Sequence, residues 1–269
     1  MKRTIAASLI ALLLLAFAGC GGGDKDEARD GLSLLMEASQ AMLEVSGYRM
    51  SGTVGMEVGA PGGGGQGQAM TVDLTADVQN ADDGMRQRML IDMGGYEVEA
   101  YIIGGVYYQN VPGQGWTKTS TGAYLSQGMN LGVVDAEQME MMADMAEDIE
   151  VVEESDEVFA LSFRLDQEYA QAVMDLYRKY VDEQDEGVSE EWLSMAEEAM
   201  ADFHAELRIW LNRADKLMRR MEMSYVMGGM SEIGEVTSSM EVDLFDYGED
   251  IVVELPAEAA QAQEIELAQ

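Results

Sequence analysis

The sequence predicts an α+β fold, in which sequential antiparallel strands form a sheet and helices are inserted between them. Most of the chain consists of segments whose apolar and polar residues alternate, and turn residues such as the glycine pair at 104–105 separate several of them. Segments with helical spacing occur in a few blocks and do not follow each strand in turn. This order of elements argues against a parallel sheet built from alternating strands and helices.

The individual elements follow from periodicity and turn chemistry. Helices are predicted at 32–46, at 136–148, from Asp166 to about residue 183, and at 190–203, because apolar residues recur there every three or four positions. Strands are predicted at 48–58, 69–79, 85–93, 96–103, 106–110, 116–121, 149–154, 158–165, 204–212, 216–227, 235–247 and 251–255.

The first twenty residues have the features of a secreted, lipid-anchored protein. A short basic stretch precedes a mostly apolar run from Ile5 to Ala18, which has the length of a signal peptide. The run ends in AFAGC, which matches the site where bacterial lipoproteins are acylated on cysteine and cleaved. Cys20 is the only cysteine of the chain and stands where that motif needs it. We therefore predict a signal peptide at 1–19 and a lipidated Cys20; an ordinary signal peptide is the alternative.

The remainder of the chain divides into a tether, one domain and a tail. Residues 20–31 contain the lipidated cysteine and a glycine-rich, charged stretch, which predicts a flexible tether. Residues 32–259 are long enough for a single domain, with a helical insertion at 166–203, and residues 260–269 form a C-terminal tail. Because the single cysteine is assigned to lipid, the fold has to be held together by burial of apolar surface.

The charge balance excludes several partners. The chain has 16 Lys and Arg against 51 Asp and Glu, a formal net charge of −35. Such a surface repels the phosphates of nucleic acids and anionic lipid headgroups. We therefore expect no nucleic-acid partner, and we expect the acyl chains on Cys20 to attach the protein to a membrane. The predicted location is the bacterial cell envelope, at the extracytoplasmic face of a membrane.

Methionine is unusually frequent, with 23 residues against five phenylalanines. In the predicted strands it falls repeatedly on the apolar side of the alternation. Methionine specifies a core poorly, but its flexible thioether adapts to partners of varied shape. We therefore predict a cavity for a lipid or another apolar small molecule; an ordinary filled core is the alternative. The candidate lining residues are Met50, Met56, Met70, Met89, Met93, Met139, Met142, Met221, Met223, Met227 and Met240.

Three stretches resemble the LppX/LprG-type and LolA-like families of bacterial lipoproteins. They are LLMEASQAMLEVSGYRMSGTV at 34–54, ELRIWLNRADKLMRRMEMSY at 206–225 and YGEDIVVELPAEA at 247–259. The resemblance implies a strongly curved antiparallel half-barrel sheet with helices covering its concave face. It also implies that the protein binds or carries lipid outside the cytoplasm. Ligand contacts in these families follow no motif, so the resemblance assigns no site residue.

The sequence offers little catalytic or metal-binding chemistry. His204 is the only histidine, no free cysteine remains, and there is no G-x-S-x-G motif. We therefore expect no enzymatic activity, no cofactor and no metal. One alternative is Cu(I) binding, because the methionine clusters at 139–145 and 218–223 resemble sets of thioether ligands. Helical and strand spacing explain the same methionines without copper.

These observations together predict a lipid-anchored, non-enzymatic binding protein that holds an apolar ligand in a methionine-rich cavity and transfers it to or from the membrane. An alternative of another class is a structural or sensory lipoprotein of the cell surface, with a filled core and a protein partner of unknown identity.

The anchor leads to the first prediction. Cys20→Ser removes the thiol that would carry the lipid, so we expect the protein to move from the membrane fraction to the soluble fraction of fractionated cells. A variant that sediments with membranes as completely as the wild type would contradict the lipidation of Cys20.

Overall fold

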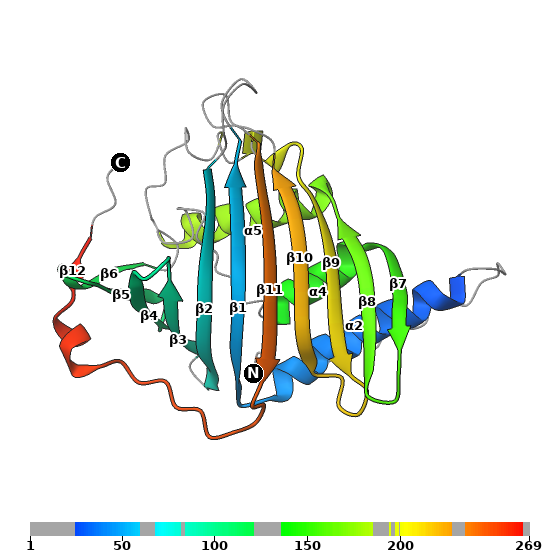
Figure 1. Ribbon diagram of the computed structural model, residues 1–269, viewed down its shortest axis with the longest axis horizontal. Helices are drawn as coiled ribbons and strands as arrows, with labels where there is room; N and C mark the ends of the chain where they lie inside the picture. Colours follow the sequence, from blue (N-terminus) through cyan, green and yellow to red (C-terminus); the bar gives the residue numbers. More distant parts are fainter. Residues whose placement is uncertain are drawn as a thin grey trace.

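The computed structural model describes residues 25–59, 68–81, 84–120, 136–184, 194, 197–198, 200–227 and 235–265. Their main feature is one twelve-stranded sheet with the order β12-β6-β5-β4-β3-β2-β1-β11-β10-β9-β8-β7, and Figure 1 shows helices behind this sheet. The strands are β1 (Gly47–Val58), β2 (Gln68–Ala81), β3 (Gly84–Asp92), β4 (Glu97–Ile103), β5 (Val106–Val111), β6 (Gly115–Ser120), β7 (Glu147–Glu154), β8 (Val158–Leu165), β9 (His204–Asn212), β10 (Met218–Met227), β11 (Val236–Phe245) and β12 (Gln263–Glu264).

The sheet is antiparallel except for its first pair, in which β12 runs parallel to β6. The observed bounds confirm most of the predicted strands to within a few residues at each end. The order also places β1, the first strand of the chain, beside β11, which lies near the end of the sequence. The resulting fold is mostly β, with helices in a minor role.

The sheet is not strongly curved, so the expectation of a strongly curved half-barrel is wrong. Strands β2, β1, β11, β10, β9, β8 and β7 stand side by side as a broad sheet in Figure 1, and only β3 to β6 turn away from it. Strong curling of a sheet depends on bulges or glycine kinks that bend the strands. Among the described ladders, register shifts occur only between β7 and β8 and between β9 and β10.

Three helices of the described chain are α2 (Lys25–Glu44), α4 (Ala136–Met145) and α5 (Gln167–Gln184). Figure 1 shows them on one side of the sheet, and we call the sheet face toward them the inner face. Leu35 and Ala38 of α2, both fully buried, belong to the same core as Met142 of α4 and the inner-face residues of the strands. Apolar residues on one face of α2 thus cover apolar residues on one face of the sheet, which is the main source of stability.

The helices agree with the sequence except at two points. α2 begins at Lys25, before the predicted start at residue 32, and therefore shares residues 25–31 with the predicted tether. Most of the predicted helix at 190–203 lies outside the described residues. No helix in the described part of the chain combines the length and the apolar character that crossing a membrane requires.

The predicted strand at 251–255 is wrong. This segment runs along the outer face without joining a ladder, and Ile251 and Val253 pack there with Tyr101 in a second apolar cluster. The side chain of Gln79 accepts a hydrogen bond of 3.1 Å from the backbone N–H of Val253. The residues that follow form a short 3₁₀ helix (Ala257–Gln261) and then β12, which adds to the sheet beside β6. The alternating pattern of 251–255 therefore reflects packing across the sheet.

The centre of the sheet provides a test of the β1–β11 register. A Cβ atom at Gly52 would lie 2.3 Å from the carbonyl oxygen of Glu241, which is held in the paired strand. We expect Gly52→Ala to lower the free energy of unfolding by about 1–3 kcal/mol or more, measured by urea denaturation, because the backbone has to move apart.

Gly55→Ala is the matched control on the same strand. Its added Cβ meets the Ser239 hydroxyl at 2.9 Å, and this side chain can rotate away. We expect a much smaller loss than at Gly52. Equal losses at the two positions would contradict the close approach of β1 and β11.

Candidate ligand-binding site

The predicted methionines divide into a closed core and a half-exposed group. Five of them are at most 7% exposed and belong to the main core: Met50, Met89, Met142, Met221 and Met240. A gap of about 10 Å³ remains among Met42, Tyr48, Met50, Met218, Met221, Val242 and Leu244. A gap of this size has room for about one water molecule, so these methionines act as packing residues in a filled core.

Four other methionines gather on the inner face at the opposite end of the long strands. Met56 lies directly opposite Met70, and Met223 lies directly opposite Met240. Met70 is 48% exposed, whereas Met56, Met223 and Met227 are half-buried. Val54 and Tyr225 lie on the same face beside these four methionines. We call the six residues together the methionine surface; they are Val54, Met56, Met70, Met223, Tyr225 and Met227.

An aromatic chain connects the methionine surface to α5. The rings of Tyr225 and Phe203 lie 6.2 Å apart, and those of Phe203 and Tyr169 lie 6.3 Å apart. Both distances are within the range of favourable aromatic pairs. Tyr169 belongs to the first turn of α5, so the helix is held against this end of the sheet. Tyr169 is not among the site residues predicted from the sequence.

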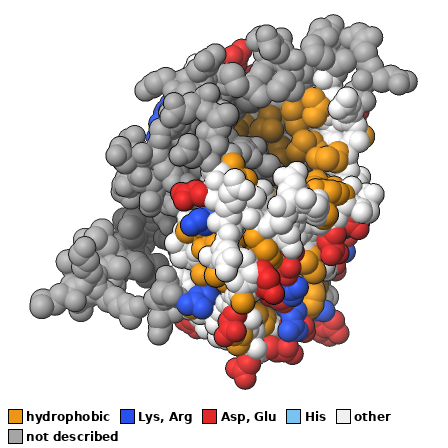
Figure 2. All heavy atoms as spheres, turned by 90° about the vertical axis from the view of Figure 1, so that its left-hand side faces the viewer, with side chains coloured by type: hydrophobic (Ala, Val, Ile, Leu, Met, Phe, Trp, Pro, Cys, Tyr) orange, Lys and Arg blue, Asp and Glu red, His pale blue; other side chains and the backbone are white. Residues whose placement is uncertain are grey.

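The methionine surface reaches an open edge of the sheet. β2 pairs with β1 from Gln68 onward, but its pairing with β3 begins only at Asp73. Within the described chain, residues 68–72 of β2 therefore have a strand neighbour on one side only. Seen from the side of β12, Figure 2 shows hydrophobic side chains in a hollow in the upper half of the molecule. Exposed apolar patches are a recognised feature of binding sites.

The remaining two candidates lie elsewhere. Met93 follows the end of β3 and is 39% exposed; its backbone N–H donates to the carbonyl oxygen of Tyr96 in the turn to β4. Met139 belongs to α4, but its side chain lies outside the described residues. Met218, which is not among the candidate lining residues, is buried. The register shift between Met218 and Arg220 puts it on the same side as Met221.

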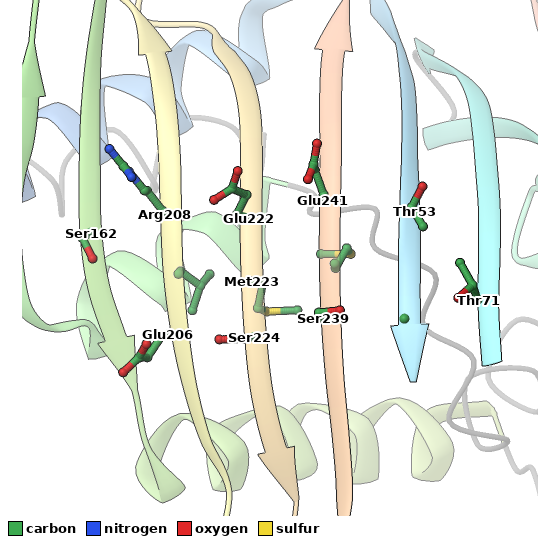
Figure 3. A pocket seen from close by; sticks show the side chains of 13 residues that line it. Thr53, Thr71, Ser162, Glu206, Arg208, Glu222, Met223, Ser224, Ser239 and Glu241 are labelled. Atoms are coloured by element: carbon green, nitrogen blue, oxygen red, sulfur yellow. The ribbon is translucent and has the colours of Figure 1, made fainter. Parts of the chain in front are cut away.

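The outer face carries a polar trough of about 600 Å³ on the other side of the same strands. Figure 3 shows hydroxyl and carboxylate side chains around it, including Ser224, Ser239, Glu222 and Glu241. Glu222 lies directly opposite Glu241, and the Arg220 guanidinium joins the two carboxylates at 2.7 and 2.6 Å. The hydrogen bond to Glu222 raises the pKa of Arg220 above its ordinary value. The trough therefore suits water and ions, whereas the inner face suits an apolar ligand.

Groups of three or more His, Cys, Asp or Glu that could hold a metal ion do not occur among the described residues. Of the two methionine clusters on which the Cu(I) alternative rests, at 139–145 and 218–223, Met218 and Met221 line the gap of about 10 Å³. Cu(I) binding by these clusters stays an alternative.

Comparison with known proteins places the chain in a family. Its residues 32–264 match the family of unknown function DUF6612, and the chain belongs to this family. No curated protein matches the sequence.

Solved structures show a distant similarity. LprF from Mycobacterium bovis is 10% identical, with a TM-score of 0.47 over 85% of this chain and 98% of that one. The LolA superfamily protein NE2245 from Nitrosomonas europaea is 11% identical, with a TM-score of 0.27 over 84% and 95%. A putative outer membrane lipoprotein-sorting protein domain from Vibrio parahaemolyticus is 12% identical, with a TM-score of 0.32 over 84% and 95%. The predicted resemblance to LppX/LprG-type and LolA-like lipoproteins is thus confirmed as structural similarity.

The division of the methionines can be tested by truncation. We expect Met221→Ala to lower the free energy of unfolding by about 2–5 kcal/mol, because it leaves a hole in a filled core. Met70→Ala should change it by no more than about 0.5 kcal/mol, because much of this side chain is in contact with water. Thermal and urea unfolding of both variants measure this difference. Similar losses in the two variants would show that the methionine surface is packed like the core.

Proposed function

We propose that this member of the DUF6612 family is a lipid-anchored, extracytoplasmic binding protein that holds the acyl chain of a lipid on its methionine surface. The observation that carries the proposal is the uneven burial of the methionines on the inner face. At one end of the long strands the core on this face is filled except for a gap of about 10 Å³. At the other end Met70 remains 48% exposed.

The chemistry of the methionine surface supports an apolar ligand of variable shape. Its residues are apolar apart from the Tyr225 hydroxyl, and four of the six are methionines. Thioether side chains change rotamer easily and make favourable contacts with many shapes, which suits chains that differ in length or branching. Leaving such residues half-exposed forgoes the free energy of burying them, which a bound acyl chain would recover.

The beginning of the sequence supports a position at a membrane. In the proposal, acyl groups on Cys20 attach the protein to the membrane and keep the domain close to the bilayer. The ligand would then pass between the membrane and the methionine surface by diffusion, without a chemical step. The protein acts as a carrier or a store, and no side chain needs a catalytic role.

The filled part of the core supports a second candidate. Most of the buried methionines pack as ordinary core residues, which is what a structural or sensory lipoprotein would need. In that case the methionine surface is a contact for a protein partner. The two candidates differ in whether an isolated protein binds lipid.

Binding of a fluorescent long-chain acyl ester tests the proposal. We expect the wild type to bind this probe and Met70→Asp to weaken binding about tenfold, which corresponds to 1.4 kcal/mol. The physical reason is that a carboxylate beside Met56 would have to lose water when the chain binds. Met36→Asp is the control, because it introduces the same charge on α2, at a position where the methionine is 55% exposed.

A wild-type protein that does not bind the probe would contradict the proposal and favour the structural or sensory candidate. If Met36→Asp weakens binding as much as Met70→Asp, the effect is one of net charge, and the methionine surface is not where the acyl chain binds.

A further inference from the structure

The described methionines differ widely in their access to water. Three of them are exposed, and these are Met36, Met70 and Met93. Four others are each 2% exposed and belong to the filled core, and these are Met50, Met89, Met218 and Met221. An oxidant dissolved in water has to reach the sulfur atom of a methionine in order to react with it. The exposed and the buried group should therefore be oxidised at very different rates.

On the inner face, the change from exposed to buried occurs between two neighbouring rows of paired residues. Met70 is 48% exposed and lies directly opposite Met56. The next row along the strands contains Val72, Val54 and Met240, which are directly paired with one another. Val72 is only 6% exposed and Met240 only 7%. Met70 is thus the part of the methionine surface that water reaches most easily, and the core behind it is closed.

Methionine is also the main sulfur chemistry that this chain offers to an oxidant. The sequence has 23 methionines and one cysteine, Cys20, which is assigned to the lipid. With that assignment no thiol is left to form a disulfide or a sulfenic acid. Compartments outside the cytoplasm, where we place the protein, are oxidising. A response of this domain to oxidants therefore has to use thioethers.

We propose that Met70 is a site of reversible oxidation, and that its sulfoxide releases the apolar ligand from the methionine surface. The oxidant is hydrogen peroxide or an organic peroxide. Its O–O bond breaks, one oxygen atom is transferred to the thioether sulfur, and water or an alcohol leaves. A thiol-dependent methionine sulfoxide reductase reverses the step. In that reaction two thiols are oxidised to a disulfide, and the oxygen leaves as water.

The sulfoxide changes the polarity of the surface and keeps most of its bulk. Its oxygen accepts hydrogen bonds from water, and these would be lost when an acyl chain covers Met70. The inference rests on the proposed function, because it describes how binding by the same surface is regulated.

The fold should persist when Met70 is oxidised. Met218 and Met221 line the gap of about 10 Å³ in the core, which has room for about one water molecule and excludes a larger oxidant. Oxidation of the exposed methionines therefore changes binding without opening the core.

Mass spectrometry of peptides from peroxide-treated, full-length protein measures the oxidation of each methionine over time. We expect Met70 to be oxidised at least about tenfold faster than Met50, Met89, Met218 and Met221, because only its sulfur is open to water. The melting temperature should stay constant while the core methionines remain unmodified.

Binding of the fluorescent acyl ester measures the release. The treatment is stopped when Met70 of the wild type is oxidised, and each protein is compared with its own untreated form. We expect the oxidised wild type to bind the probe about tenfold more weakly, or 1.4 kcal/mol, and the reductase to restore binding. Met70→Leu has a side chain of similar volume without sulfur, so its affinity should not change with the treatment.

The matched controls are Met36→Leu and Met93→Leu. Each removes an exposed thioether that lies away from the methionine surface, on α2 and after β3 respectively. Both variants should lose affinity on oxidation as the wild type does, because Met70 is still present.

The outcomes separate the two proposals. If the untreated wild type does not bind the acyl ester, the proposed function fails and the inference fails with it. If it binds, and the sulfoxide of Met70 forms without a loss of affinity, the proposed function stands and the inference is overturned. Equal losses in the wild type and in Met70→Leu would also overturn it, because the effect would then come from another residue. Oxidation of the core methionines as fast as Met70 would do the same.

Discussion

One face of the sheet is apolar and the other is charged, and this division has to hold across twelve strands. A slip of one residue in any ladder would exchange the two faces, so register is the constraint on which the rest of the structure depends. Burial enforces it on the inner face, where Leu35 of α2 and Phe163 of β8 belong to one core. A close approach of backbones enforces it between β1 and β11. The burial of this face is uneven, since Met221 is 2% exposed and Met70 is 48% exposed, and the proposed ligand lies at the exposed end.

The outer face shows how a strongly acidic chain tolerates its own charge. Arg49 contacts three carboxylates, those of Asp77, Asp246 and Glu249, at distances between 2.7 and 3.2 Å. Arg220 does the same for Glu222 and Glu241, which face each other across β10 and β11. Like charges in direct opposition destabilise a sheet, and a bridging guanidinium offsets this. The few basic residues are thus used to bind strands to each other.

The alternation of apolar and polar residues was sufficient to predict most strands, because each strand has one buried face. The antiparallel order also followed from the sequence, whereas the neighbours β1 and β11 did not, since pairing over such a distance leaves no local signal. Met218 was missed because a register shift breaks the alternation on which the interpretation depended. The segment 251–255 was assigned to a strand because Ile251 and Val253 alternate with exposed residues, although they pack across strands rather than beside one.

The candidate site could be predicted only in part. The methionine count and its side of the sheet indicated an adaptable apolar surface, but only the structure separates Met221, in a filled core, from Met70, which is half in water. The exposed fraction of each methionine depends on elements that are far away in the sequence, which no local pattern encodes.

We propose that the inner face of this sheet holds the acyl chain of a lipid. Native mass spectrometry of the Cys20→Ser protein, purified from cells without detergent, measures this directly. We expect a bound mass that dissociates as a lipid and is reduced in Met70→Asp. A single species at the mass of the protein alone, also after incubation with a long-chain acyl ester, would contradict the proposal.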